Sequence, residues 1–131
     1  MTVQDRWFAK LFFLKPLALM TFALFWIATG LISIGPGYEI GVAHMLAGGA
    51  GNWSGPVVIA GGLADLVIGL LIAFRRTARL GLWAAFFLSL SYAVIGTLIL
   101  PALWIEPLGP MLKIWPIICL NLFLLATLEE R

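Results

Sequence analysis

The stretch PVVIAGGLADLVIGLLIAF, residues Pro56 to Phe74, decides the fold of this chain. Every residue in it is apolar or small except Asp65, and arginines follow directly at Arg75 and Arg76. A helix needs about 20 predominantly apolar residues to cross the roughly 30 Å hydrocarbon core of a bilayer. The stretch therefore predicts a transmembrane helix that carries one acidic side chain near its centre.

The composition of the whole chain supports a membrane location. Of its 131 residues, 63% are hydrophobic and 11% are charged, and the mean hydropathy is +1.08. A soluble domain carries roughly 25% charged residues. These values exclude an ordinary cytosolic enzyme, a nucleic-acid-binding protein and a disordered chain, so we expect an integral membrane protein with no nucleic-acid partner.

Three further apolar stretches surround the central one. No charge occurs between Lys15 and Glu39, and the first of these stretches ends at Gly35-Pro36-Gly37, a run typical of a helix exit. The short connection from Arg75 to Arg79 makes the second and third helices antiparallel neighbours. We expect an all-α, four-transmembrane-helix antiparallel bundle as a single domain over residues 1–131. The expected spans are about 16–34, 56–74, 78–100 and 110–128, with Lys113 reaching the interface from the last of them.

The distribution of basic residues predicts the orientation. Every Lys and Arg except Lys113 lies before the first span, in the Arg75 to Arg79 turn or at the C-terminus. The positive-inside bias then places both termini and this turn in the cytoplasm. The segments Gly35 to Gly55 and Pro101 to Leu112 are expected outside. We expect a multi-pass protein of the bacterial inner membrane.

The N-terminal region admits two interpretations. The apolar run is too long for a signal peptide and no A-x-A cleavage site follows it, so we expect an uncleaved first helix. Residues Thr2 to Leu14 place apolar side chains at helical spacing beside Arg6 and Lys10, which is typical of an interfacial amphipathic helix. A simple cytoplasmic extension of the first helix explains the same pattern.

Counting residues from the span ends predicts a polar layer near the middle of the membrane. A carboxyl group at this depth costs several kcal/mol unless it is protonated, paired or hydrated. Gly61, Gly62 and Gly69 share the helical face of Asp65, and such a small face lets another helix approach closely. We expect this face to pack against the small and polar residues Ala85, Ser89, Tyr92 and Gly96 of the third span. The candidate ligand or polar-core residues are Asp65, Tyr92, Ser89, Asn121 and Trp26.

Asp65 has a structural and a functional interpretation. In the first, it hydrogen-bonds Tyr92, Ser89 or Asn121 and holds helices together. In the second, it accepts protons or binds a ligand beside a pocket for a small apolar molecule such as a quinone, whose reduction consumes protons as well as electrons. Contact with another subunit is a third explanation. We expect no intrinsic cofactor, with a quinone or a bound lipid as the candidate ligand.

The outer segments contain the remaining candidate polar residues, Glu39, His44, Glu106 and Lys113. Imidazole and carboxylate groups bind metals, but this spacing matches no recognised metal pattern. We therefore expect a solvated or loop-tying His44 and no metal site. The glycine-rich segment Gly41 to Gly51 resembles a mobile lid or a re-entrant piece at the interface.

The other notable side chains favour structural roles. Trp7, Trp53, Trp104 and Trp115 fall near the span ends, where tryptophan anchors at headgroup depth. Trp26 and Trp83 are expected to pack inside the bundle. Cys119, the one cysteine, excludes an internal disulfide and is expected to be a buried small hydrophobe. We assemble no catalytic set from these residues.

Several short runs together resemble the DoxX-like family of small four-helix membrane proteins. The later runs are similar to the version of this family that forms a membrane tail on some short-chain-dehydrogenase-like proteins. The resemblance covers nearly the whole chain and rests on a combined set of runs. They are Phe13-Leu14-Lys15-Pro16, Phe25 to Leu31, Gly61 to Leu66 with Gly69, Tyr92 to Gly96, Pro101 to Trp104, Glu106 to Pro110, Lys113, Pro116 and Asn121.

The resemblance implies a four-span fold and membership of membrane redox or sulfur-oxidation assemblies that contain quinone. We therefore expect a non-catalytic membrane subunit that anchors or stabilises a redox complex and contributes to a quinone or lipid site. Two alternatives are an oligomeric small-molecule carrier or channel with Asp65 lining its path, and a DoxX-like membrane oxidoreductase component. The expected partners are membrane lipid and either other membrane subunits or further copies of the chain.

Overall fold

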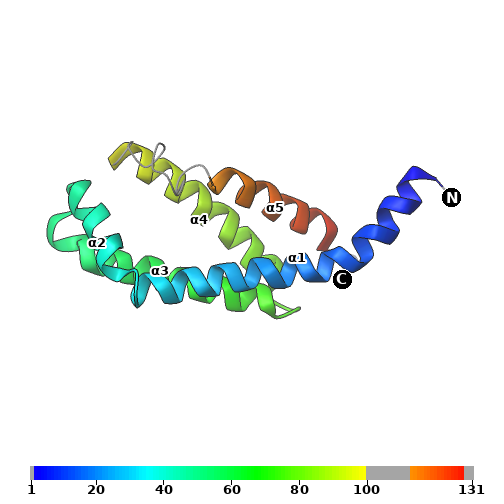
Figure 1. Cartoon of the computed structure of the whole chain (residues 1–131), viewed down its shortest axis with the longest axis horizontal. Helices are drawn as coiled ribbons and strands as arrows, with labels where there is room; N and C mark the ends of the chain where they lie inside the picture. Colours follow the sequence, from blue (N-terminus) through cyan, green and yellow to red (C-terminus); the bar gives the residue numbers. More distant parts are fainter. Residues whose placement is uncertain (1, 100–112, 129–131) are drawn as a thin grey trace.

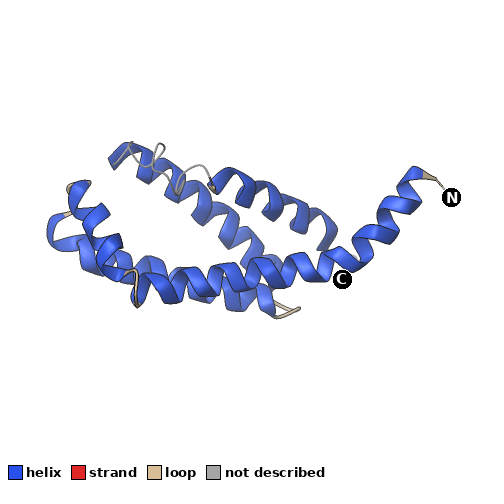
Figure 2. Ribbon diagram, in the orientation of Figure 1, coloured by secondary structure: helices blue, strands red, loops and turns tan. Residues whose placement is uncertain are grey.

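The computed structural model describes residues 2–99 and 113–128, and this part of the chain is helical with no strand (Figures 1 and 2). Five α-helices follow one another along the sequence, with a short 3-10 turn before the third. They are α1 (Val3–Ile34), α2 (Tyr38–Ala47), α3 (Ser54–Ala73), α4 (Ala78–Ile99) and α5 (Ile114–Thr127), and the 3-10 turn covers Gly51–Trp53.

Three of the helices are long and apolar enough to cross a membrane: α1, α3 with its preceding turn, and α4. The bounds of α3 and α4 agree with the second and third predicted spans to within two residues. The described helix α5 is apolar and has 14 residues, which corresponds to about 21 Å. The predicted start of the fourth span near Pro110 lies outside the described residues, so a fourth crossing stays a prediction.

Helix α1 begins well before the expected span, in agreement with the interpretation that the N-terminal residues extend the first helix. It starts at Val3 and continues through Pro16 without a break, so Pro16 lies inside the helix and not in its first turn. A capping box explains the early start, because the Thr2 hydroxyl accepts from the Asp5 backbone N–H at 3.1 Å and the Asp5 carboxylate accepts from the Thr2 N–H at 2.9 Å. Residues Thr2 to Leu14 thus continue the first helix, and this segment projects beyond the bundle (Figure 1).

Helices α1 and α3 form the most extensive pair and touch through their backbones. A Cβ atom added at Gly30 would lie 2.5 Å from the Gly62 carbonyl oxygen, and one at Gly69 would lie 2.8 Å from the Ala23 carbonyl oxygen. The close approach allows many van der Waals contacts, which drive helix association in lipid. The expectation that this glycine face meets the third span is wrong for Gly62 and Gly69, since α1 covers them.

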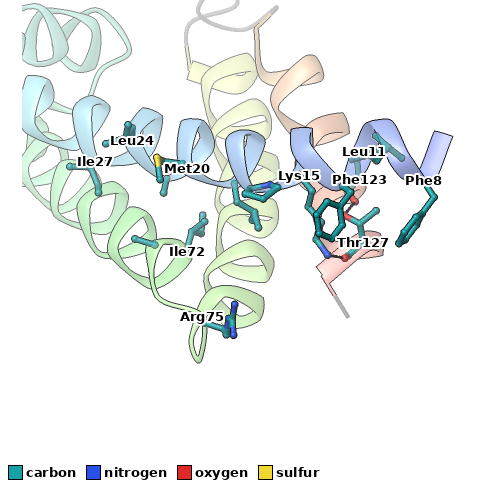
Figure 3. Close-up of a pocket in the computed structure, with 15 residues that line it drawn as sticks. Phe8, Leu11, Lys15, Met20, Leu24, Ile27, Ile72, Arg75, Phe123 and Thr127 are labelled. Carbon is teal, nitrogen blue, oxygen red and sulfur yellow. Dashed lines mark hydrogen bonds between the residues drawn. The ribbon is translucent and has the colours of Figure 1, made fainter. Parts of the chain in front are cut away.

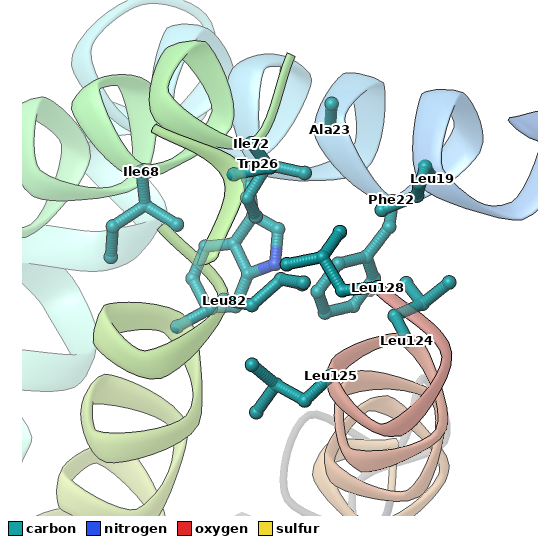
Figure 4. Packing of buried hydrophobic residues seen from close by; sticks show 12 residues of the cluster. Leu19, Phe22, Ala23, Trp26, Ile68, Ile72, Leu82, Leu124, Leu125 and Leu128 are labelled. Atoms are coloured by element: carbon teal, nitrogen blue, oxygen red, sulfur yellow. The ribbon is translucent and has the colours of Figure 1, made fainter. Parts of the chain in front are cut away.

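The remaining core forms where α4 and α5 pack on each other and on α1. Its larger cluster includes Phe22 and Trp26 of α1, Ile72 of α3, Leu82 of α4 and Leu124 of α5 (Figure 4). A smaller cluster contains Ala93 of α4 with Ile114 and Ile118 of α5. These contacts place α4 and α5 side by side, and α3 joins them to α1.

One end of the bundle gathers the chain segments that were predicted to share a membrane side. The N-terminal part of α1, the turn between α3 and α4, and the end of α5 lie there, whereas α2 lies at the opposite end (Figure 1). This arrangement agrees with the grouping of the basic residues. The assignment of that end to the cytoplasm stays a prediction.

The first part of the segment Gly41 to Gly51, which was expected to be a mobile lid or a re-entrant piece, is helical. Residues 41–47 belong to helix α2, which packs on the beginning of α3. A Cβ atom at Gly41 would lie 3.1 Å from the Val58 side chain, and one at Gly55 would lie 2.7 Å from the Tyr38 hydroxyl. Small residues at these two positions therefore let α2 lie close against α3.

We predict that Gly30→Leu destabilises the protein by about 2–3 kcal/mol, because the added side chain collides with the α3 backbone. Thermal or denaturant unfolding in detergent measures the change. Ala28→Leu is the matched control, since Ala28 lies two residues away on the exposed face of α1. Equal stability of the two variants would contradict the glycine crossing.

Candidate functional site

Asp65 and Tyr92 form a hydrogen-bonded pair between α3 and α4. The Asp65 side chain is 4% exposed, although it belongs to a helix that is otherwise apolar. The Tyr92 hydroxyl donates to Asp65 Oδ1 at 3.1 Å, and the Gly61 carbonyl oxygen lies 3.4 Å from the same hydroxyl. The contact expected between the Asp65 face and Tyr92 is therefore present.

Gly61 makes room for this pair. A Cβ atom there would lie 3.2 Å from the Tyr92 hydroxyl oxygen, closer than nearly all such contacts. Gly61 thus differs in role from Gly62 and Gly69, which face α1. The small residues on this face of α3 therefore contact two helices, α4 through Gly61 and α1 through Gly62 and Gly69.

The second carboxyl oxygen of Asp65, Oδ2, makes no hydrogen bond within residues 2–99 and 113–128. A charged carboxylate buried in an apolar interior is costly, and one hydroxyl donor offsets only part of this cost. A neutral carboxyl would accept from Tyr92 through Oδ1 and keep its own O–H for another acceptor. Oδ2 of Asp65 is therefore available to form a hydrogen bond with a further group.

Three more predicted residues are buried but not joined to this pair. Ser89, Asn121 and Trp26 are 3%, 0% and 3% exposed. Ala85 clusters with Leu124 and Leu125 on one side of Ser89 and Asn121, and Ala93 clusters with Ile118 on the other. Ser89 and Asn121 therefore lie at the same level of the α4–α5 pair.

Asn121 and Trp26 contain buried polar atoms without hydrogen-bond partners in the described part of the chain. Both side-chain amide atoms of Asn121 are in this state, as is Nε1 of Trp26. The Trp26 indole lies among Ile72, Leu82 and Leu128 (Figure 4). The Ser54 hydroxyl at the start of α3 is also buried without a hydrogen-bond partner in the described part. An unpaired buried polar group costs about 1–3 kcal/mol, so a native structure that keeps three such side chains needs an explanation.

A comparison with known protein families shows which family the chain belongs to. A family model described as the DoxX-like family matches residues 23–122. The chain belongs to the DoxX-like family. The matched range of this DoxX-like chain includes Trp26, Asp65, Tyr92 and Asn121. No curated protein and no solved structure matches the chain.

Three of the four outer candidate residues of the DoxX-like chain lie in the described part. Glu39 is exposed and His44 is half-buried, and both lie on α2, whereas Lys113 is exposed at the start of α5. Glu106 lies outside the described residues. Within the described part, no three His, Cys, Asp or Glu side chains gather where they could hold a metal ion.

The exposed tryptophans fit an interfacial belt. Trp7, Trp53 and Trp115 are 63%, 72% and 53% exposed, and they lie near helix ends as expected. Trp104 lies outside the described residues.

Trp83 and Cys119 correct two expectations. Trp83 is 45% exposed and stacks on Phe87 at a ring distance of 6.0 Å, so it does not pack inside the bundle. Cys119 is exposed and is not a buried hydrophobe. In a membrane, the outward face of a helix is as apolar as its inward face, so hydrophobicity alone does not distinguish them.

Lys15 has a structural role that the sequence analysis did not assign. Its ammonium group donates to the carbonyl oxygen of Thr127 at the end of α5. A cation near a helix C-terminus is stabilised by the unpaired carbonyl groups there. The contact joins the first and last described helices, and only the position of Lys15 directly before Pro16 in an otherwise apolar run could have drawn attention to it.

We predict that Asp65 and Tyr92 are energetically coupled by about 1 kcal/mol, the size of a hydrogen bond between transmembrane helices. A double-mutant cycle with Asp65→Asn and Tyr92→Phe measures this coupling from unfolding in detergent. A second cycle with Ser91→Ala in place of Tyr92→Phe is the control, because the Ser91 hydroxyl bonds the Phe87 carbonyl within α4. Additive effects of Asp65→Asn and Tyr92→Phe would show that the pair contributes no coupling.

Proposed function

We propose that this DoxX-like chain is a non-catalytic membrane subunit that anchors or stabilises a redox complex and contributes to a quinone site. The observation that carries the proposal is the buried polar layer with unused hydrogen-bonding groups. Within the described residues, Asp65 Oδ2 makes no hydrogen bond, and Asn121 and Trp26 have buried N–H groups without partners.

A quinone fits the chemistry of this layer. It has an apolar ring and two carbonyl oxygens that accept hydrogen bonds, so it needs donors in an apolar surrounding. Asn121 Nδ2 and Trp26 Nε1 are such donors, and both lie in the interior of the bundle. Asp65 adds a carboxyl group able to exchange a proton when a quinone is reduced. The same groups would be costly if nothing ever bound them.

The N-terminal part of α1, before Pro16, supports a role within a larger assembly. This segment extends past the other helices (Figure 1), and Trp7 and Phe13 on it are 63% and 78% exposed. Aromatic side chains are enriched in the buried centres of protein interfaces. We propose that a partner subunit of the redox complex packs on this segment.

We predict that Asn121→Leu keeps or raises stability but lowers the bound quinone about tenfold. The substitution removes the orphan amide at similar size, which relieves a desolvation cost and deletes the donor. Organic extraction of protein purified in mild detergent, followed by chromatography, measures quinone per chain, and unfolding measures stability. Ser91→Ala is the control on the exposed face of α4.

Two results would contradict the quinone site. One is the absence of quinone from wild-type protein isolated from its native membrane. The other is a full quinone content in both Asn121→Leu and Asp65→Asn. Solute uptake into liposomes that Asp65→Asn abolishes would instead support the carrier.

We predict that native mass spectrometry of gently extracted protein shows a complex with at least one different polypeptide. Phe13→Ala should weaken this association without changing the unfolding temperature, because Phe13 makes little contact within the chain. Leu31→Ala is the matched control, since Leu31 is 51% exposed at the other end of α1. Recovery of homo-oligomers alone would contradict the subunit role.

A further inference from the structure

A groove of about 670 Å³ lies between residues Phe8 to Ile27 of α1, the end of α3 and the end of α5 (Figure 3). Its volume is in the range of sites that bind small molecules. Apolar residues of α1 form most of its wall, among them Met20, Leu24 and Ile27. Only Lys15, Arg75 and Thr127 in its described lining have polar side chains.

The two cations of the groove lie toward the same end of the bundle. Helices α1 and α3 run antiparallel, with Ala23 against Gly69, so the residues before Ala23 lie beside the residues after Gly69. Lys15 of α1 and Arg75, which follows α3, therefore lie toward the same end of the two helices, and both line the groove (Figure 3). Thr127, whose carbonyl oxygen accepts from Lys15, closes the groove on the α5 side.

The length of the apolar part matches one leaflet of a membrane. From Lys15 to Ile27 the helix advances twelve residues, which corresponds to about 18 Å. Half of the hydrocarbon core is about 15 Å thick. A lipid with its phosphate at the level of the cations would therefore lay an acyl chain along Met20, Leu24 and Ile27.

We propose that this groove binds one anionic phospholipid of the surrounding leaflet, with its phosphate between Lys15 and Arg75. Basic pockets between helices attract acidic headgroups, and each basic residue near the surface contributes attraction. The site is independent of the proposed quinone site, because Asp65, Tyr92 and Asn121 do not line the groove.

Native mass spectrometry during titration with phosphatidylglycerol or phosphatidylcholine tests the proposal on the full chain. We expect one phosphatidylglycerol to bind preferentially, and Arg75→Gln to weaken its binding about fivefold. Arg76→Gln is the matched control, because Arg76 is exposed on the same turn but does not line the groove. Equal losses from the two substitutions would indicate general surface charge and overturn the site.

A second variant tests the apolar part without changing charge. Met20→Trp fills the groove and should reduce phosphatidylglycerol binding, whereas Leu31→Trp adds the same bulk to an exposed part of α1 outside the groove. Unchanged binding in Met20→Trp would overturn the proposal. Equal affinity for the two lipids, or displacement of the lipid by millimolar inorganic phosphate, would do the same.

Discussion

The structure depends on one constraint, which is that the carboxyl group of Asp65 lies in a helix surrounded by apolar residues. A membrane interior provides no water to solvate it, so another helix must supply a partner. Tyr92 does so across the α3–α4 contact, with its hydroxyl 3.1 Å from the carboxyl oxygen. This requirement fixes the rotation of α3, because the side that carries Asp65 must turn toward α4.

The rotation of α3 determines how the other helices are placed. With Asp65 turned toward Tyr92, the adjoining glycines Gly62 and Gly69 meet the backbone of α1. Gly61 lies between the two contacts and leaves space for the tyrosine hydroxyl. Helices α1 and α4 thus take neighbouring positions on α3, and α5 completes the core against α4 and the middle of α1.

The sequence predicts this pair well because its chemistry is rare in a membrane. A single acid in an apolar run needs a partner at the same depth, and counting residues from the helix ends places Tyr92 among three candidate partners, with Ser89 and Asn121. The partner of the glycine face is not predictable in this way, because small residues permit a close approach without specifying the neighbour. Trp83 and Cys119 illustrate a related limit, since burial and lipid exposure favour the same apolar side chains.

The proposed quinone site and the proposed lipid site lie in different parts of the packed helices. The interior layer keeps polar atoms that the described helices do not satisfy, whereas the groove lies where the long helix α1 passes the ends of α3 and α5. Membership of the DoxX-like family establishes the membrane character of the chain, and the ligands assigned to these sites are our proposals. The N-terminal part of α1, which begins before the matched range, contributes to the groove and to the proposed partner surface but not to the interior layer.

Asp65 is enclosed by helices and does not face lipid. Labelling with dicyclohexylcarbodiimide, a lipid-soluble reagent that attacks protonated carboxyl groups, tests this enclosure most directly. The reference is Val67→Asp in an Asp65→Asn background, which moves the carboxyl to a position that is 53% exposed. We expect rapid labelling of the relocated carboxyl in this variant and little labelling of Asp65 in the wild type. Equally rapid labelling of both would contradict this expectation.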